Sequence, residues 1–291
     1  MRESQLRKGA EHMARRGVFL LMIVLVAASL TGCGTGKTEA KGGDDSAQRA
    51  VAVLDRAHAR LKQAEGLQYV TEGIQKTRIH HKNKQSRSEV RQQIRTEAGY
   101  GPDRFHIVAL AGDSPSEEIY LNQQTMYLKD PEMNRWEKIS AKGTDGMALD
   151  LINPHDPKRL LKQLRLLRED WTLTKRQGDY LLEMELTGER IAPYIREVWH
   201  GQKEPAVMDS SPDLVKWKHH LQVSRIQQTI RLDAETFRPI RLERKIHAEV
   251  KMDGFHLTTE LDLKTDVRET DRPFQIPAQV KQSAKEIEPD K

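Results

Sequence analysis

The chain has 291 residues, of which 48 are lysine or arginine and 43 are aspartate or glutamate, giving a formal net charge of +5. Residues 1–32 carry +3 of this charge, so the other 259 residues carry only +2, with both signs mixed along the chain. Nucleic-acid binding requires clustered basic charge and is not predicted. With a single cysteine, Cys33, the chain has no disulfide framework and no thiolate metal site.

The first 32 residues have the organisation of a secretory signal peptide. Basic residues between Arg2 and Arg16 are followed by an apolar stretch over 18–29, which has the length of a signal h-region and is too short for a transmembrane helix. Small residues then lead to Cys33. We expect residues 1–32 to be removed from a precursor that starts at Met1 or Met13. An uncleaved anchor with an incidental cysteine is the alternative.

The segment Leu30-Thr31-Gly32-Cys33 resembles the lipobox of bacterial lipoproteins. The resemblance implies diacylglyceryl transfer to the Cys33 thiol, cleavage before this residue and acylation of the new N-terminus. Two or more acyl chains anchor a protein stably to a membrane. The expected location is therefore the extracytoplasmic face of the cell membrane. Residues 33–45, which are polar and glycine-rich, are expected to form a flexible tether.

The same region contains Gly36-Lys37-Thr38, which matches the last three residues of a phosphate-binding loop motif. Such a loop needs a further glycine five positions before Gly36, and the chain has Thr31 there. The loop must also open a helix with an apolar face, whereas residues 39–45 are polar and glycine-rich. A nucleotide site is not predicted.

After the tether, the pattern predicts a helix and then a series of strands. A helix is expected over 46–65, with Ser46 as N-cap, because apolar residues from Ala50 to Ala64 recur at spacings of three and four. In the segments that follow, apolar and polar residues alternate with a period of two, and turn residues separate the segments. This pattern predicts a series of strands. Their ranges are 69–78, 89–98, 104–110, 117–121, 125–129 and 135–139.

The second half of the chain continues with helices and a clear meander. Asp156-Pro157 opens a helix that is expected to run through Leu167. A hairpin over 171–175 and 180–187 and a helix over 189–199 follow. Strands are predicted over 226–232, 240–250 and 255–264, where one face is apolar and the other is charged. This pattern is typical of an antiparallel sheet with one face in water.

Together these elements predict an α+β fold in which a single domain spans 46–291. Its main element is a large curved antiparallel β-sheet, or half-barrel. The three amphipathic helices are the only elements available to cover the apolar face, so they are expected on the concave side. A cavity can form between the sheet and these helices.

The expected architecture and two stretches of sequence resemble a known family. The stretches are "EIYLNQQTMYLKDPEMNRWEKI" and "IRLDAETFRPIRLERKIHAEVKMDGFHLTTELDL". With the helix over 46–65 they resemble the LolA/LppX-like lipoproteins, and more closely the lipoproteins of this shape from spore-forming bacteria (Firmicutes). The resemblance implies a half-barrel that holds a lipid or other apolar molecule, or a degenerate version that serves as a sensor or adaptor.

No motif for catalysis or metal binding is present in the sequence. The chain lacks a Gly-x-Ser-x-Gly elbow and a His-Glu-x-x-His motif, and adjacent histidines on a strand point to opposite faces. No enzyme activity, cofactor or metal is predicted.

Three side chains are candidates for ligand binding. Tyr127 and Trp136 lie on neighbouring predicted strands and would line a pocket, with packing in the core as the alternative. Arg244 lies on the apolar face of its strand, where it either extends to water at the rim or meets the headgroup of a ligand. Two functions are expected as alternatives. The first is a membrane-anchored binder or carrier of a lipid or other apolar ligand, and the second is a non-enzymatic envelope adaptor or sensor that contacts a protein partner.

Overall fold

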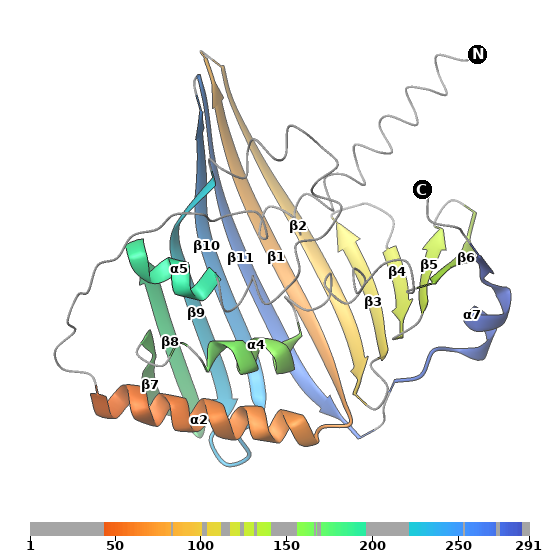
Figure 1. Ribbon diagram of the computed structural model, residues 1–291, viewed down its shortest axis with the longest axis horizontal. Helices are drawn as coiled ribbons and strands as arrows, with labels where there is room; N and C mark the ends of the chain where they lie inside the picture. Colours follow the sequence, from red (N-terminus) through yellow and green to blue (C-terminus); the bar gives the residue numbers. More distant parts are fainter. Residues whose placement is uncertain are drawn as a thin grey trace.

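The computed structural model describes residues 44–286, except 83, 101–103, 112–116, 123–124, 131–132, 141–155, 166, 168–169, 196–220, 253 and 272–273. The predicted signal peptide and acylation site at Cys33 therefore lie outside the described residues. A single large sheet runs across the whole molecule (Figure 1). None of the described helices is long and apolar enough to cross a membrane.

All eleven strands predicted from the period-two alternation are present, and most of them are longer than expected. They are β1 (Gly66–His81), β2 (Lys84–Gly99), β3 (Arg104–Ala111), β4 (Glu117–Leu121), β5 (Thr125–Asp130), β6 (Arg135–Ser140), β7 (Thr172–Arg176), β8 (Asp179–Thr187), β9 (Leu221–Asp233), β10 (Pro239–Met252) and β11 (Phe255–Thr270). A short strand near the C-terminus, β12 (Lys285–Glu286), was not predicted.

The sheet joins two meanders that are far apart in the sequence. Its strand order is β12-β6-β5-β4-β3-β2-β1-β11-β10-β9-β8-β7. The two meanders meet where β1 pairs with β11, and these strands run antiparallel over sixteen residues, from Gly66 opposite Thr270 to His81 opposite Phe255. Strand β12 pairs with β6 in parallel at one edge.

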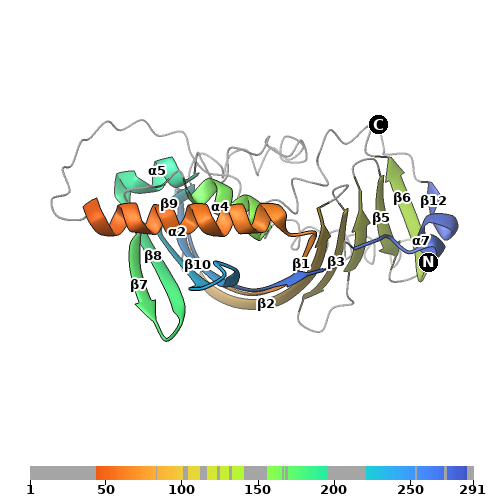
Figure 2. The same cartoon turned by 90° about the horizontal axis from the view of Figure 1, so that it is seen from below.

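The sheet is curved and open, and the helices within residues 44–194 lie on its concave side (Figure 2). We call this side the inner face and the opposite side the outer face. Helices α2 (Asp44–Gln63) and α4 (Pro157–Leu164) lie within the concavity. The α+β fold predicted from the sequence, with a curved antiparallel half-barrel and a few helices on its concave face, is confirmed.

The main core lies between these helices and the inner face. From α2 the residues Ala50, Leu54, Ala57 and Leu61 are fully buried, as their spacing of three and four predicts. Leu160, Leu161 and Leu164 of α4 are buried beside them.

The start of α4 and the chain after it are held by hydrogen bonds to side chains. The Asp156 side chain caps α4 by accepting a hydrogen bond of 3.0 Å from the Lys158 N–H. Trp171, also buried, donates its indole N–H to the Leu164 carbonyl at 3.2 Å. These contacts connect α4 to the chain that leads into β7.

Several predicted helix boundaries are wrong. Helix α2 begins at Asp44 rather than Ser46, so the last two residues of the predicted tether are helical, and the Ser46 hydroxyl accepts a bond from the Leu173 N–H. Helix α4 ends at Leu164, while Leu167 is buried outside it and its N–H bonds to the Leu164 carbonyl.

The helix predicted over 189–199 is also shorter than expected where it is described. There is a 3-10 turn, η3 (Gly188–Arg190), followed by α5 (Ile191–Tyr194). Pro193 lies in the first turn of α5, where the missing N–H has no helical partner to lose. Residues 196–199 lie outside the described part of the chain.

Candidate functional site

The inner face of β10 carries one charged residue within an otherwise apolar row. Leu242, Arg244, Ile246, Ala248 and Val250 alternate along this face and are all buried. The residues between them point to the outer face, as the sequence predicts. A charge at the second position of a buried row is the least expected feature of the inner face, because a charged group is costly to remove from water.

Arg244 is held by neutral groups. It is only 5% exposed, so its guanidinium does not extend to water at the rim. Its Nε–H donates to Gln228 Oε1 at 3.1 Å, and Gln228 Nε2 donates to the Glu243 carbonyl at 2.9 Å. The Tyr194 hydroxyl is also beside Arg244. Burial raises the pKa of Tyr194, and the positive charge of Arg244 lowers it by a smaller amount. Among the described aspartates and glutamates, none forms an ion pair with Arg244.

A small cavity lies beside Arg244, under the start of α4. Its volume is about 20 Å³, and its lining includes Pro157, Leu160, Gln228, Leu242 and Leu263. A cavity of this volume holds about one water-sized group. This cavity is too small for a long apolar ligand.

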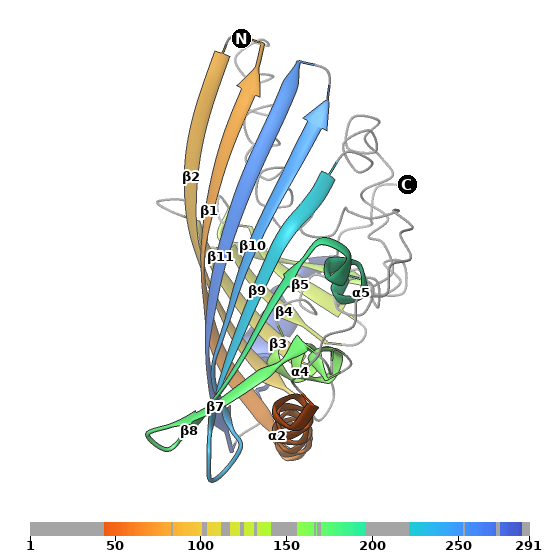
Figure 3. The ribbon, with the colours of Figure 1, turned by 90° about the vertical axis from the view of Figure 1, so that its left-hand side faces the viewer.

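Beyond α4 the inner face continues as an apolar surface, which we call the far section. It is defined by Ile79, Ala248, Val250 and Leu257, of which the last three are buried. Val250 pairs directly with Leu257 across β10 and β11. Figure 3 shows that β1, β2, β10 and β11 extend well past α2, α4 and α5, so these helices lie toward the other end of the strands.

The structure separates Tyr127 and Trp136 from Arg244. On β5, Met126 and Leu128 contact the main core while Tyr127 between them points to the outer face. There Tyr127 and Trp136 pack with the C-terminal segment, which we define as residues 274–286. This segment includes α7 (Ala278–Ser283) and contributes Phe274, Ile276, Val280 and Ala284 to the cluster. The three predicted ligand-binding residues therefore do not form one site.

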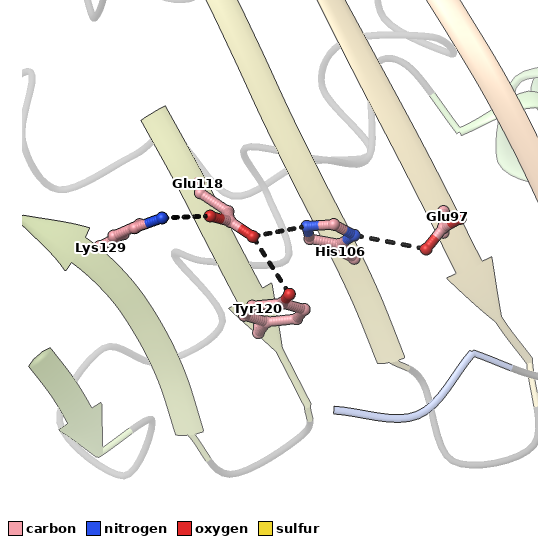
Figure 4. A network of polar contacts seen from close by, with 5 residues as sticks. All are labelled: Glu97, His106, Glu118, Tyr120 and Lys129. Carbon is pink, nitrogen blue, oxygen red and sulfur yellow. Dashed lines mark hydrogen bonds and ion pairs between the residues drawn. The ribbon is translucent and has the colours of Figure 1, made fainter. Parts of the chain in front are cut away.

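A polar network on the outer face adjoins this aromatic cluster (Figure 4). His106 lies between two carboxylates, with Nδ1 3.3 Å from Glu97 Oε2 and Nε2 3.1 Å from Glu118 Oε1. Both contacts are hydrogen bonds only when the imidazole carries both protons. Glu118 also accepts from Tyr120 and from Lys129, each at 3.1 Å.

The network changes the acidities of its members. Burial raises the pKa of Glu118, but the hydrogen bonds from Lys129, Tyr120 and His106 lower it by more, and the net change is downward. Burial and the neighbouring Glu118 charge raise the pKa of Tyr120 to about 12. Tyr120 stacks on His106 with ring centroids 4.4 Å apart, and Phe274 stacks on His106 at 5.5 Å. The network therefore connects β2–β5 to the C-terminal segment.

Sequence reasoning missed this outer-face site. These residues become neighbours only through the pairing of adjacent strands, which places Glu97 opposite His106 and His106 opposite Tyr120. Spacing along a single strand does not reveal such neighbours.

The outer face of the central strands also forms a wide, open groove. Its volume is about 690 Å³, and charged side chains of both signs line it, among them Lys76, Lys245, Glu260 and Asp262. Cross-strand ion pairs such as Lys245 with Asp262, at 3.6 Å, are exposed to water. Apolar side chains, Ile74, Ile246 and Leu261, also line the groove, so it is mixed in character. No group of three metal-ligating side chains is arranged to hold an ion in the described part of the chain.

Comparison with solved structures returns proteins of low sequence identity. The lipoprotein LppX of Mycobacterium tuberculosis is 9% identical, with 79% of this chain and 99% of that chain covered, at a TM-score of 0.37. A putative outer membrane lipoprotein-sorting protein domain from Vibrio parahaemolyticus is 13% identical, with 79% of this chain and 95% of that chain covered, at a TM-score of 0.25. A DUF1329 family protein from Desulfovibrio piger is 12% identical, with 78% of this chain and 94% of that chain covered, at a TM-score of 0.23.

These names agree with the LolA/LppX-like resemblance predicted from the sequence. The scores are too low to carry an argument about ligand or mechanism, and the half-barrel architecture is established by the sheet order and the position of the helices. A comparison with curated proteins finds no match. A family profile matches residues 50–285, most of the chain, and the protein therefore belongs to the family described as "Family of unknown function (DUF6612)".

Proposed function

We propose that this protein is an extracytoplasmic lipoprotein, held to the membrane by acylated Cys33, that binds or carries a lipid or other apolar molecule on the inner face of its half-barrel. The observation that carries the proposal is the open half-barrel, whose concave face is apolar along β10 and β11. Large apolar surfaces on the concave side of a sheet are typical of binding sites for apolar ligands.

The place of the ligand follows from packing. The inner face under α4 has room for about 20 Å³, and Ala248, Val250 and Leu257 are at most 5% exposed, so a ligand with a long chain has to displace the groups that cover the far section. Burial of an acyl chain contributes about 0.8 kcal/mol for each CH₂ group, so binding there does not require polar contacts. An anchor at Cys33 would keep the domain close to the membrane from which such a ligand comes.

The test is lipid binding by the chain without residues 1–33. The described helices and strands lie within residues 44–286, so we expect this truncated chain to fold. We expect lipid extraction and mass spectrometry to detect a bound lipid, and a fluorescent fatty acid to titrate to saturation. Ala248→Leu should weaken probe binding because it adds bulk to the inner face. Glu249→Leu, which adds bulk to the outer face of the same strand, is the matched control.

A second candidate function is an envelope adaptor that acts through protein contacts. The observation that favours it is the groove of about 690 Å³ on the outer face, lined by charged and apolar side chains, which is far larger than the cavity of about 20 Å³ under α4. If the purified chain carries no lipid and binds no apolar probe, the adaptor is the better account.

A further inference from the structure

We infer that the cavity beside Arg244 is a binding site for one monatomic anion of the size of chloride, which neutralises the buried guanidinium. This site is independent of the proposed function, because it needs neither a lipid nor a membrane anchor. It assigns a ligand to a place on the inner face where a buried charge and free space lie together.

The first argument is the charge of Arg244. This residue is 5% exposed, and it forms no ion pair with any of the described aspartates and glutamates. Its Nε–H bonds to the Gln228 amide oxygen at 3.1 Å, and the Tyr194 hydroxyl also contacts it, so both partners are neutral. A guanidinium has five N–H donors, and these two partners leave donors for an anion. A buried charge without an opposite charge is costly, and an anion in contact offsets that cost.

The orientation of Gln228 shows that the amide positions the arginine. Gln228 is 1% exposed, and its amide nitrogen donates to the Glu243 carbonyl at 2.9 Å and to the Thr229 carbonyl at 3.4 Å. Its oxygen is therefore directed at Arg244. Since the amide is neutral, it holds the guanidinium in place without neutralising it.

The second argument is size. The cavity has a volume of about 20 Å³. One water molecule needs about 10–15 Å³ by the same measure, so the cavity has room for one water or for one slightly larger atom. Chloride is a single atom slightly larger than a water molecule and matches this room. Carboxylate, phosphate and sulfate groups, which have several heavy atoms, do not.

The lining of the cavity favours an anion over a water molecule. Most of its walls are apolar and come from Pro157, Leu160, Leu242 and Leu263. The Thr265 hydroxyl, which shares a hydrogen bond of 2.9 Å with Thr71, is a further polar group there. A water molecule would fill the space but leave the charge of Arg244 without an opposite charge. A monatomic anion fills the same space and neutralises this charge.

The acidic residues nearest in sequence to the lining are directed elsewhere. Glu243 contributes its backbone, because its side chain lies on the outer face of β10. Asp156, which precedes Pro157, accepts hydrogen bonds from the Tyr100 hydroxyl at 2.7 Å and from the Lys158 N–H at 3.0 Å. Neither carboxylate takes the place of the anion.

The experiment compares chloride with gluconate, an anion too large for the cavity, at the same pH and ionic strength. The full chain, in a non-ionic detergent, is unfolded by heat in sodium chloride and in sodium gluconate. We expect Tm to rise with chloride and to saturate. At a concentration about ten times the dissociation constant, Tm should be about 3–6 °C above the value in gluconate. The folded chain should also broaden the chlorine NMR line.

Two variants locate the effect. Arg244→Met removes the charge but keeps a long side chain, and it should abolish both the rise in Tm and the line broadening. Arg241→Gln is the matched control, because Arg241 lies on the outer face of the same strand, where it pairs with Asp266 at 2.6 Å. It should keep both effects.

A crystallographic measurement on the parent chain serves if Arg244→Met does not fold. Bromide replaces chloride in such sites and is located by its anomalous scattering. We expect one peak in contact with the Arg244 guanidinium, and an absent peak would overturn the inference.

The remaining outcomes are equally clear. Equal Tm values in the two salts overturn the inference and mean that water fills the cavity. A chloride effect that persists in Arg244→Met places the anion elsewhere and overturns it too. A bromide peak at Arg244 without a chloride-dependent Tm would indicate an adventitious ion only. None of these results bears on the proposed function, since lipid binding is measured separately.

Discussion

Replacing Leu242 with alanine should be far more destabilising than replacing its neighbour Glu243. Leu242 is 3% exposed, belongs to the main core and lines the cavity of about 20 Å³ under α4. Truncation of a buried leucine costs about 2–5 kcal/mol, and the cost rises with the volume of the space that remains. Here the removed atoms enlarge an existing cavity next to the rigid β10–β11 ladder, so we expect about 4 kcal/mol.

This magnitude can be measured by thermal or urea unfolding. For a domain of this size, 1 kcal/mol shifts Tm by about 2–4 °C, so Leu242→Ala should lower Tm by roughly 8–16 °C. Glu243 points to the outer face, and its backbone carbonyl, which accepts from Gln228, is retained in Glu243→Ala. The change in the free energy of unfolding should then stay within about 0.5 kcal/mol. Equal losses in the two variants would refute the assignment of inner and outer faces.

Four further predictions test other parts of the molecule. Cys33→Ala should leave an unprocessed precursor, and a variant that still partitions into detergent at the mature size would rule out acylation there. Burial raises the pKa of Asp156, so the folded state loses stability as pH rises above 3.8, the ordinary value. Asp156→Asn should therefore gain stability relative to the parent in urea melts above this pH, with the gain disappearing below it. Trp171→Phe removes the hydrogen bond to Leu164 and should cost about 1–2 kcal/mol in the same assay, whereas an unchanged stability would mean that the bond contributes nothing. Phe274→Ala should speed hydrogen exchange in 276–286 without changing β9–β11, and uniform acceleration would contradict a local role.

The strands were predictable because their side chains alternate between water and the core. On β10 and β11 the apolar residues at every second position identify both the strands and the buried face, and the structure confirms both. The ends of the helices were less predictable. Ser46 has the chemistry of an N-cap, but its hydroxyl accepts from Leu173, a contact with a residue more than a hundred positions away. Local pattern does not contain such a contact.

The candidate site was predictable only in part. Arg244 was recognisable from the sequence as a charge on an apolar face. Its burial and its bond to Gln228 depend on the register between β9 and β10, which places these two residues opposite each other. The environment of Tyr127 and Trp136 was not predictable, because the segment that covers them lies at the other end of the chain.

The sequence by itself therefore determined which residues form strands and which face of each strand is buried. Each of these properties depends on the preference of single side chains for water or for an apolar environment, repeated at a fixed period. The tertiary structure decided that β1 pairs with β11, that the C-terminal segment covers part of the outer face, and that His106 lies between Glu97 and Glu118. These features depend on the register between strands that are distant in sequence, and register is set by the packing of the whole sheet.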